Sequence, residues 1–243
     1  RFEPVTMGVV RDQYLNARSL LPPGARVVEI SSNDSWMRDC GPTFVSNGKT
    51  LRAVDWGFNA WGGLYTDFTL DELVAQKVAE IERVDRYKVP LILEGGSIHT
   101  DGQGTLLTTR ECLLNPNRNP QLTQEQIEEH LRAYVNVEQI IWLERGIYND
   151  ETNGHVDNFC CFLRPGEVAL AWTDDRSDPQ YEISRENEEI LQTAVDARGR
   201  RLKVNRIPLP APQYITREES EGVEPVDGTL PRLAGDRLAA SYI

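Results

Sequence analysis

Histidine, cysteine and basic residues are scarce in this sequence, and a long apolar run is missing. The 243 residues include three histidines and four cysteines, and 26 basic residues stand against 38 acidic ones, which gives a net charge of −12. No apolar segment reaches the roughly 18 residues that a membrane-spanning helix needs. So acidic a surface argues against nucleic acids and anionic membranes as partners. It suits a small cationic ligand instead.

The few cysteines and histidines do not have the spacing of a zinc site. No CxxC, HxH or HExxH pattern occurs, so we expect no structural metal ion. Cys160 and Cys161 are neighbours, and their Cα atoms, about 3.8 Å apart, are too close for a normal disulfide. Four cysteines without a pattern are typical of a reducing compartment, which predicts a cytoplasmic protein.

A pattern of helices and strands repeats along the chain. Amphipathic helices are predicted to begin near residues 11, 70, 124 and 180, with strands between them, so a unit recurs about every 55 residues. Thr123 is the predicted N-cap of the third helix, with Gln126 three residues on. A unit too small to bury its own apolar face predicts circular or stacked assembly of an α/β fold.

The predicted strands and the two chain ends complete this outline. The strands are expected at 4–10, 26–30, 43–45, 51–56, 89–93, 97–100, 105–109, 139–143, 156–163, 168–172 and 202–207. The proline-rich segment after Ile207 predicts an ordered loop or lid. The chain opens on Arg1 rather than methionine and ends on a strand-like 239–243, so we expect a fragment that lacks material at both ends.

Polar, acidic or glycine-rich loops follow predicted strands in three of the repeats. They carry Asp39, Glu94 and the pair His155 and Asp157. If the units surround an axis, these loops converge and the four side chains line one pocket. Three carboxylates around a histidine repel one another unless a cation is present. That cation is either a metal ion or a guanidinium or ammonium ligand.

A guanidinium ligand is compatible with these residue types. Carboxylates accept paired hydrogen bonds from its planar edge. His155 and Asp157 are two residues apart, so on a strand they would face the same side. Asp157 could then hold a ligand nitrogen while His155 moves protons.

Each of these short motifs also has a plain structural interpretation. The Gly-His-x-Asp-Asn segment fits a turn with a satisfied histidine, and Trp36 and Trp61 fit packing residues. Cys40 follows Asp39, whose charge would raise the pKa of the thiol, so Cys40 is not an expected nucleophile.

Several ordered stretches, taken together, resemble the agmatine deiminase family of the guanidine-modifying, peptidyl-arginine deiminase-like superfamily. They are Asn33–Pro42, Asp55–Gly63, Leu93–Asp101, Glu111–Pro120, Asn153–Cys161, Asp174–Tyr181 and Arg232–Tyr242. The resemblance implies the pentein fold, an α/β propeller of repeated helix–strand units. This chain would hold about three to four of five units, in a single catalytic domain, residues 1–243, that is incomplete at both ends.

The resemblance also implies a reaction and roles. Agmatine would be hydrolysed to N-carbamoylputrescine and ammonia, in putrescine and polyamine biosynthesis, through a covalent amidino-cysteine. The family's cysteine nucleophile lies near its C-terminus, so we expect it outside this chain, which by itself would be inactive. By motif, Asp39, Asp157 and Glu94 would hold guanidinium nitrogens, His155 would be general acid and then base, and Trp36 would wall the pocket. The resemblance implies a homodimer, and it implies no metal or organic cofactor.

Three other interpretations stay open from the sequence. The same chemistry could act on arginine or peptidyl-arginine, if Arg38 or Arg118 bound the α-carboxylate of free arginine. The protein could bind guanidines or polyamines without catalysis, or it could be a structural repeat protein.

Overall fold

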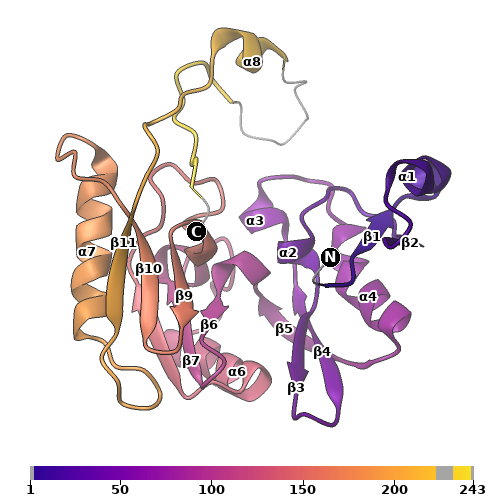
Figure 1. Ribbon diagram of the computed structural model, residues 1–243, viewed down its shortest axis with the longest axis horizontal. Coiled ribbons are helices and arrows are strands. Elements are labelled where there is room, and N and C mark those ends of the chain that lie inside the picture. Colours follow the sequence, from indigo (N-terminus) through magenta and orange to yellow (C-terminus); the bar gives the residue numbers. More distant parts are fainter. Residues whose placement is uncertain (1–2, 223–231, 242–243) are drawn as a thin grey trace.

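A computed structural model describes residues 3–222 and 232–241. It is a mixed α/β structure with four small sheets, whose strand orders are β1-β2, β3-β4-β5, β6-β7-β8 and β11-β10-β9. Figure 1 shows these sheets following one another in chain order, from indigo on the right to orange on the left.

The elements have the following bounds. The strands are β1 Thr6–Val9, β2 Arg26–Glu29, β3 Thr43–Ser46, β4 Leu51–Gly57, β5 Asp85–Ile92, β6 His99–Thr100, β7 Thr105–Thr109, β8 Gln139–Leu143, β9 Cys160–Arg164, β10 Glu167–Trp172 and β11 Lys203–Pro208. The α-helices are α1 Tyr14–Leu20, α2 Met37–Cys40, α3 Ala60–Gly63, α4 Val74–Glu82, α5 Arg110–Leu113, α6 Gln124–Val135, α7 Pro179–Thr193 and α8 Arg217–Gly222. Short 3₁₀ turns are η1 Arg11–Gln13, η2 Asp71–Leu73, η3 Gly95–Ser97 and η4 Val156–Asn158.

The three larger sheets share one topology. Each begins with an antiparallel pair, β3/β4, β6/β7 or β9/β10, and then adds a parallel strand, β5, β8 or β11. Parallel neighbours need a crossover connection, and α4, α6 and α7 lie in these connections. The β1/β2 pair is parallel too, with α1 between its strands. The repeat predicted from the sequence is therefore confirmed.

Local sequence signals explain where the helices begin. The Thr123 side chain accepts a hydrogen bond from the Gln126 backbone amide, and the Gln126 side chain accepts one from the Thr123 backbone amide, which is the predicted capping box of α6. Asp178 caps α7, whose first residue is Pro179. On α6, Ile127 and Leu131 are fully buried, so the amphipathic face predicted from the sequence covers the sheet.

The apolar cores lie between units rather than inside them. One cluster joins β4 and β5 to β7, β8 and α6, and a second joins β7 and β8 to β9, β10 and α7. A third packs Ile30, Cys40 and Phe58 against Val74 of α4. Because neighbours share cores, they hold their loops in fixed relative positions.

The predicted strand over 156–163 is wrong in its first half. Val156–Asn158 forms η4, and β9 begins only at Cys160. The loop satisfies its own polar groups: the His155 amide bonds the Thr152 hydroxyl, and the Asn158 amide bonds the His155 carbonyl. This local bonding competes with a strand ladder. His155 and Asp157 therefore do not share a strand face. Similarly, the strand predicted over 97–100 keeps only β6, because Gly95–Ser97 forms η3.

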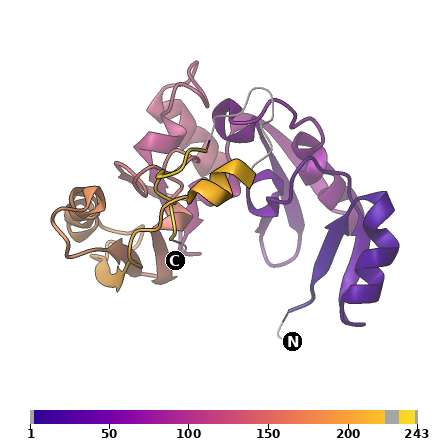
Figure 2. The same cartoon turned by 90° about the horizontal axis from the view of Figure 1, so that it is seen from above.

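The segment after Ile207 is held to the rest of the chain by ion pairs. Arg232 bonds Glu151 through two nitrogens, and Arg237 bonds Asp178. This segment carries α8, at the top of Figure 1, and Figure 2 shows it between α7 and α1 when seen from above. Pro225 and the end of the strand predicted over 239–243 lie outside the described residues, and 239–241 form no strand. Among the described helices, none combines the length and apolar character that crossing a bilayer requires.

Candidate functional site

Three short elements from different repeats bring the predicted polar residues together around Gly96. A methyl group on its Cα would lie 2.6 Å from His155 Nδ1, 2.7 Å from Asp157 Oδ2 and 2.8 Å from Asp39 Oδ1. Asp39 comes from α2, Gly96 from η3 and the other two from the start of η4. The η4 turn thus brings His155 and Asp157 to one place, although they do not lie on a strand as predicted.

Asp39 is fixed by two hydrogen bonds. Its Oδ1 accepts from the Gly96 amide at 2.9 Å, and its Oδ2 accepts from Trp61 Nε1 at 3.0 Å. Trp61 is buried and lies in a turn with four successive positive φ angles, at Ala60 (53°), Trp61 (54°), Gly62 (85°) and Gly63 (88°). Such a conformation strains the alanine and the tryptophan and is often found where a side chain must be aimed. Trp61 is buried, as expected of a packing residue, but no signal in the sequence indicates its hydrogen bond to Asp39.

Trp36 lies beside this group but faces outward. It is 48% exposed, and its ring meets the Trp61 ring edge-on with centroids 6.3 Å apart. Its Nε1 donates to Asp34. The position fits the predicted pocket wall, a role that stays a prediction.

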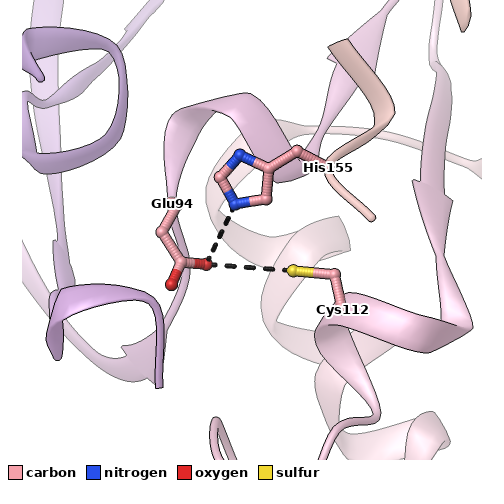
Figure 3. A group of neighbouring side chains, drawn as sticks. All are labelled: Glu94, Cys112 and His155. Carbon is pink, nitrogen blue, oxygen red and sulfur yellow. Dashed lines mark hydrogen bonds and ion pairs between the residues drawn. The ribbon is translucent and has the colours of Figure 1, made fainter. Parts of the chain in front are cut away.

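Glu94 is completely buried and has one oxygen committed to another side chain. Its Oε1 accepts from Arg118 Nε at 2.7 Å, and both side chains are 0% exposed. Its Oε2 lies 3.7 Å from His155 Nε2 and 4.0 Å from Cys112 Sγ, as Figure 3 shows. Burial alone would raise the pKa of Glu94, but His155 and Arg118 outweigh it and lower the pKa. The carboxylate therefore stays charged.

Arg118 ties the Glu94 loop to the loop that precedes His155. Besides Glu94, its guanidinium donates to Asn117 Oδ1, Asn153 Oδ1 and the Thr152 carbonyl at 2.7–2.9 Å. Because Arg118 is buried and its guanidinium already donates to these groups, it cannot bind a substrate carboxylate. The prediction that Arg118 could bind the α-carboxylate of arginine is therefore wrong. The sequence does not reveal that this side chain is buried.

His155 is buried with acidic groups on both sides. Its Nδ1 lies 3.8 Å from Asp39 Oδ1, and its Nε2 finds no hydrogen-bond partner among the described residues. Burial by itself lowers the pKa of His155, but contacts with Cys112 and Glu94 and the charge of Asp39 raise it well above its usual value. The imidazole is therefore a proton carrier with an available N–H, as a general acid requires.

Asp157 is the carboxylate that burial affects most visibly. Desolvation raises its pKa to about 6; the His155 charge opposes this and the Asp39 charge adds to it. At neutral pH Asp157 is still ionised, because the pH lies above its raised pKa. A bound cation would stabilise that charge.

None of the four thiols is activated. Burial raises the pKa of Cys40 to about 12, with further contributions from Asp71 and Asp39. Burial also raises the pKa of Cys112, Cys160 and Cys161. A nucleophilic cysteine needs the opposite shift. Cys112 nevertheless lies against Glu94 and His155, which no signal in the sequence indicated.

Replacing Gly96 with alanine should lower the free energy of unfolding by about 1–3 kcal/mol, the usual cost of overpacking. The new methyl group would push against His155, Asp157 and Asp39 at distances that real Cβ atoms do not adopt. Urea unfolding followed by circular dichroism measures the effect. Gly24→Ala is the control, since no atom of the described residues lies within 4 Å of its Cβ position. Equal stability of the two variants would contradict the convergence on Gly96.

The chain is similar to known proteins along its whole length. The chain is 57% identical over 250 aligned positions to an agmatine deiminase of Pseudomonas aeruginosa, and 52% identical over 257 to one of Medicago truncatula. It is covered completely in both matches and spans 68% and 69% of these relatives. The solved agmatine deiminase of Enterococcus faecalis superposes with a TM-score of 0.94 at 49% identity, over 99% of this chain and 67% of that one.

The family model of the Porphyromonas-type peptidyl-arginine deiminases matches residues 1–243, the whole chain. Together with relatives well above 30% identity, this match shows that the chain belongs to the Porphyromonas-type peptidyl-arginine deiminase family.

Proposed function

We propose that the protein is an agmatine deiminase whose substrate guanidinium binds beside Gly96. The observation that carries the proposal is the gathering of Asp39, Asp157 and His155 within 2.6–2.8 Å of one point. Two carboxylates there offer acceptors to a flat cation, and Gly96 leaves room because it has no side chain. The relatives named agmatine deiminases support the choice of substrate.

The proposed chemistry splits the reaction into two steps. Asp39 and Asp157 hold guanidinium nitrogens while a cysteine thiolate attacks the carbon. The C–N bond breaks, and the leaving nitrogen takes a proton from His155 and departs as ammonia. His155 then removes a proton from water, which attacks the amidino-cysteine and expels the thiolate. N-carbamoylputrescine is left. Such acid–base help contributes about 10²–10⁴-fold to the rate.

Glu94 has a narrower part in this proposal than the resemblance alone implied. Because Oε1 is held by Arg118, only Oε2 faces the site. That oxygen stabilises the protonated His155 and offers at most one acceptor to the substrate. The attacking sulfur is not assigned to Cys40, Cys112, Cys160 or Cys161, because all four pKa values are raised.

The remaining parts of the proposal concern the whole molecule. The repeated sheets support a pentein propeller in a single catalytic domain, with the site loops at its axis. We further propose a cytoplasmic homodimer that acts in putrescine biosynthesis without a metal or organic cofactor, and that does not bind nucleic acid.

Arginine is the second candidate substrate, because one cation near the site remains available. Arg38 is exposed, forms no ion pair among the described residues, and its charge acts to lower the pKa of Asp157. It could bind an α-carboxylate. Against this, the carboxylates of Asp39, Glu94 and Asp157 repel a substrate that carries an additional negative group.

Agmatine should bind at least about tenfold more tightly than arginine, since a net repulsion of about 1.4 kcal/mol suffices for that ratio. Isothermal titration calorimetry with each ligand measures both affinities. Arg38→Gln is the companion variant: it should leave agmatine affinity unchanged or slightly higher. If arginine bound more tightly than agmatine and lost that affinity in Arg38→Gln, arginine rather than agmatine would be the substrate.

A further inference from the structure

A second kind of cation fits the buried cluster of Glu94, Cys112 and His155. Figure 3 shows the three side chains pointing toward one another from three separate segments. Glu94 Oε2, Cys112 Sγ and a ring nitrogen of His155 all lie within 4.8 Å of one another, and all three residues are buried. We propose that these residues form a binding site for Zn²⁺ or a similar thiophilic divalent ion, and that the bound ion inhibits the enzyme.

The separations are close to those of a tetrahedral site. Zinc bonds of about 2.0–2.3 Å to oxygen, nitrogen and sulfur place ligand atoms about 3.4–3.6 Å apart. Here Oε2 lies 3.7 Å from Nε2 and 4.0 Å from Sγ. Small side-chain movements would therefore bring the three ligand atoms to bonding distance of one ion, with the fourth tetrahedral position left open. A carboxylate, an imidazole and a thiolate form a mixed ligand set that suits zinc.

His155 Nε2 supplies the second observation that points to a ligand. Nε2 is buried and without a hydrogen-bond partner among the described residues. Buried polar atoms are nearly always bonded, so an exception calls for an explanation such as a bound ion or a catalytic role. Nε2 is directed at Glu94 Oε2, the same oxygen that Cys112 approaches.

Surrounding residues hold the three ligands in place. Arg118 occupies Glu94 Oε1, so the other oxygen is the one presented to the cluster. The Thr109 hydroxyl accepts from the Cys112 amide and donates to the Gly154 carbonyl, directly before His155. Partners of this kind orient metal ligands, and losing one typically costs about 10–100-fold in metal affinity.

Ion entry balances the charge of the cluster. Binding needs a thiolate and a neutral imidazole, so the Cys112 thiol and His155 Nε2 each release a proton as the doubly charged ion arrives. The net charge of the buried cluster does not change. The ion would then be bonded to His155 Nε2 and Glu94 Oε2, which the proposed reaction needs. Its positive charge would also repel a guanidinium. This inhibition rests on the proposed function, whereas the metal site itself does not.

Cobalt titration of the purified, metal-free protein tests the site. Co²⁺ bound by a thiolate gives a sulfur-to-metal charge-transfer band in the ultraviolet, and Zn²⁺ should displace it. Wild type and Cys160→Ser should both show the band, because Cys160 is buried in a different core cluster. Cys112→Ser should lose it and should weaken Zn²⁺ binding by more than the roughly 10–100-fold that the loss of an outer-shell partner costs. A band that persists in Cys112→Ser, or is absent from wild type, overturns the proposal.

Two further measurements keep the outcomes separate. If Cys112→Ser does not fold, X-ray absorption of the wild-type zinc complex decides: one sulfur ligand supports the site, and none overturns it. Agmatine titrations with and without Zn²⁺ test the inhibition. A thiolate–metal complex that leaves agmatine affinity unchanged contradicts the inhibition. Agmatine binding without any metal complex removes the metal site and leaves the proposed function standing.

Discussion

Replacing Arg118 with methionine should lower the free energy of unfolding by about 3–5 kcal/mol, the range for breaking a buried ion pair. The change leaves the Glu94 carboxylate with 0% exposure and no counter-charge on Oε1. It also removes the donors for Asn117 Oδ1, Asn153 Oδ1 and the Thr152 carbonyl. Each unsatisfied buried group adds to the cost. Denaturant unfolding at neutral pH measures the change.

The matched control for Arg118 is Arg145→Met. Arg145 pairs with Glu186, but the two side chains are 51% and 40% exposed, so the loss should stay within about 1 kcal/mol. Adding Glu94→Gln to Arg118→Met removes the stranded charge and should restore part of the lost stability. Similar small effects for Arg118→Met and Arg145→Met, or no recovery in the double variant, would show that Arg118 does not hold Glu94 in its charged form.

Replacing Asp157 with asparagine should weaken agmatine binding about 10–100-fold, since hydrogen bonds to a charged group contribute about 1.5–3 kcal/mol. In wild type, affinity should fall as the pH drops through about 6, where Asp157 takes up a proton. Asp157→Asn should lack this titration. Calorimetry across that pH range, with a chelator present, measures both effects. Asp85→Asn is the control, because that side chain is 78% exposed and pairs with Arg52.

The same substitution should raise stability at neutral pH. The pKa of Asp157 is about 6 in the folded protein and about 3.9 in an unfolded chain. A raised carboxyl pKa means that the stability Asp157 contributes is present below about 4 and is lost as the pH rises through about 6. Asp157→Asn avoids that loss, so its melting temperature should exceed that of wild type at pH 7 and not at pH 4. Loss of agmatine affinity with a lower melting temperature at pH 7 would indicate misfolding rather than a missing ligand contact.

Much of the secondary structure could be predicted because its signals are local. The Thr123 and Gln126 pair marks the start of α6 within one turn of chain, and the strands β7 and β8 have the predicted bounds. The prediction failed at 156–158, where side chains of the loop itself satisfy the backbone and replace the strand.

The site could be predicted only in part. The polar loops and the resemblance pointed to Asp39, Glu94, His155 and Asp157, and the structure places all four in one region. The sequence did not indicate that Trp61 holds Asp39, or that Cys112 approaches Glu94. These contacts join residues more than 15 positions apart, and no periodicity records such a distance in space.

The sequence by itself determined the repeated α/β units, the acidic surface and the family resemblance, because composition, periodicity and motifs are properties of the chain. Only the tertiary structure decided that Glu94 is paired with Arg118, that His155 Nε2 lacks a hydrogen-bond partner among the described residues, and that Asp157 is buried enough to raise its pKa to about 6. Charge states and free valences depend on the dielectric and the neighbours around each group, and these exist only after the loops of separate units have packed together.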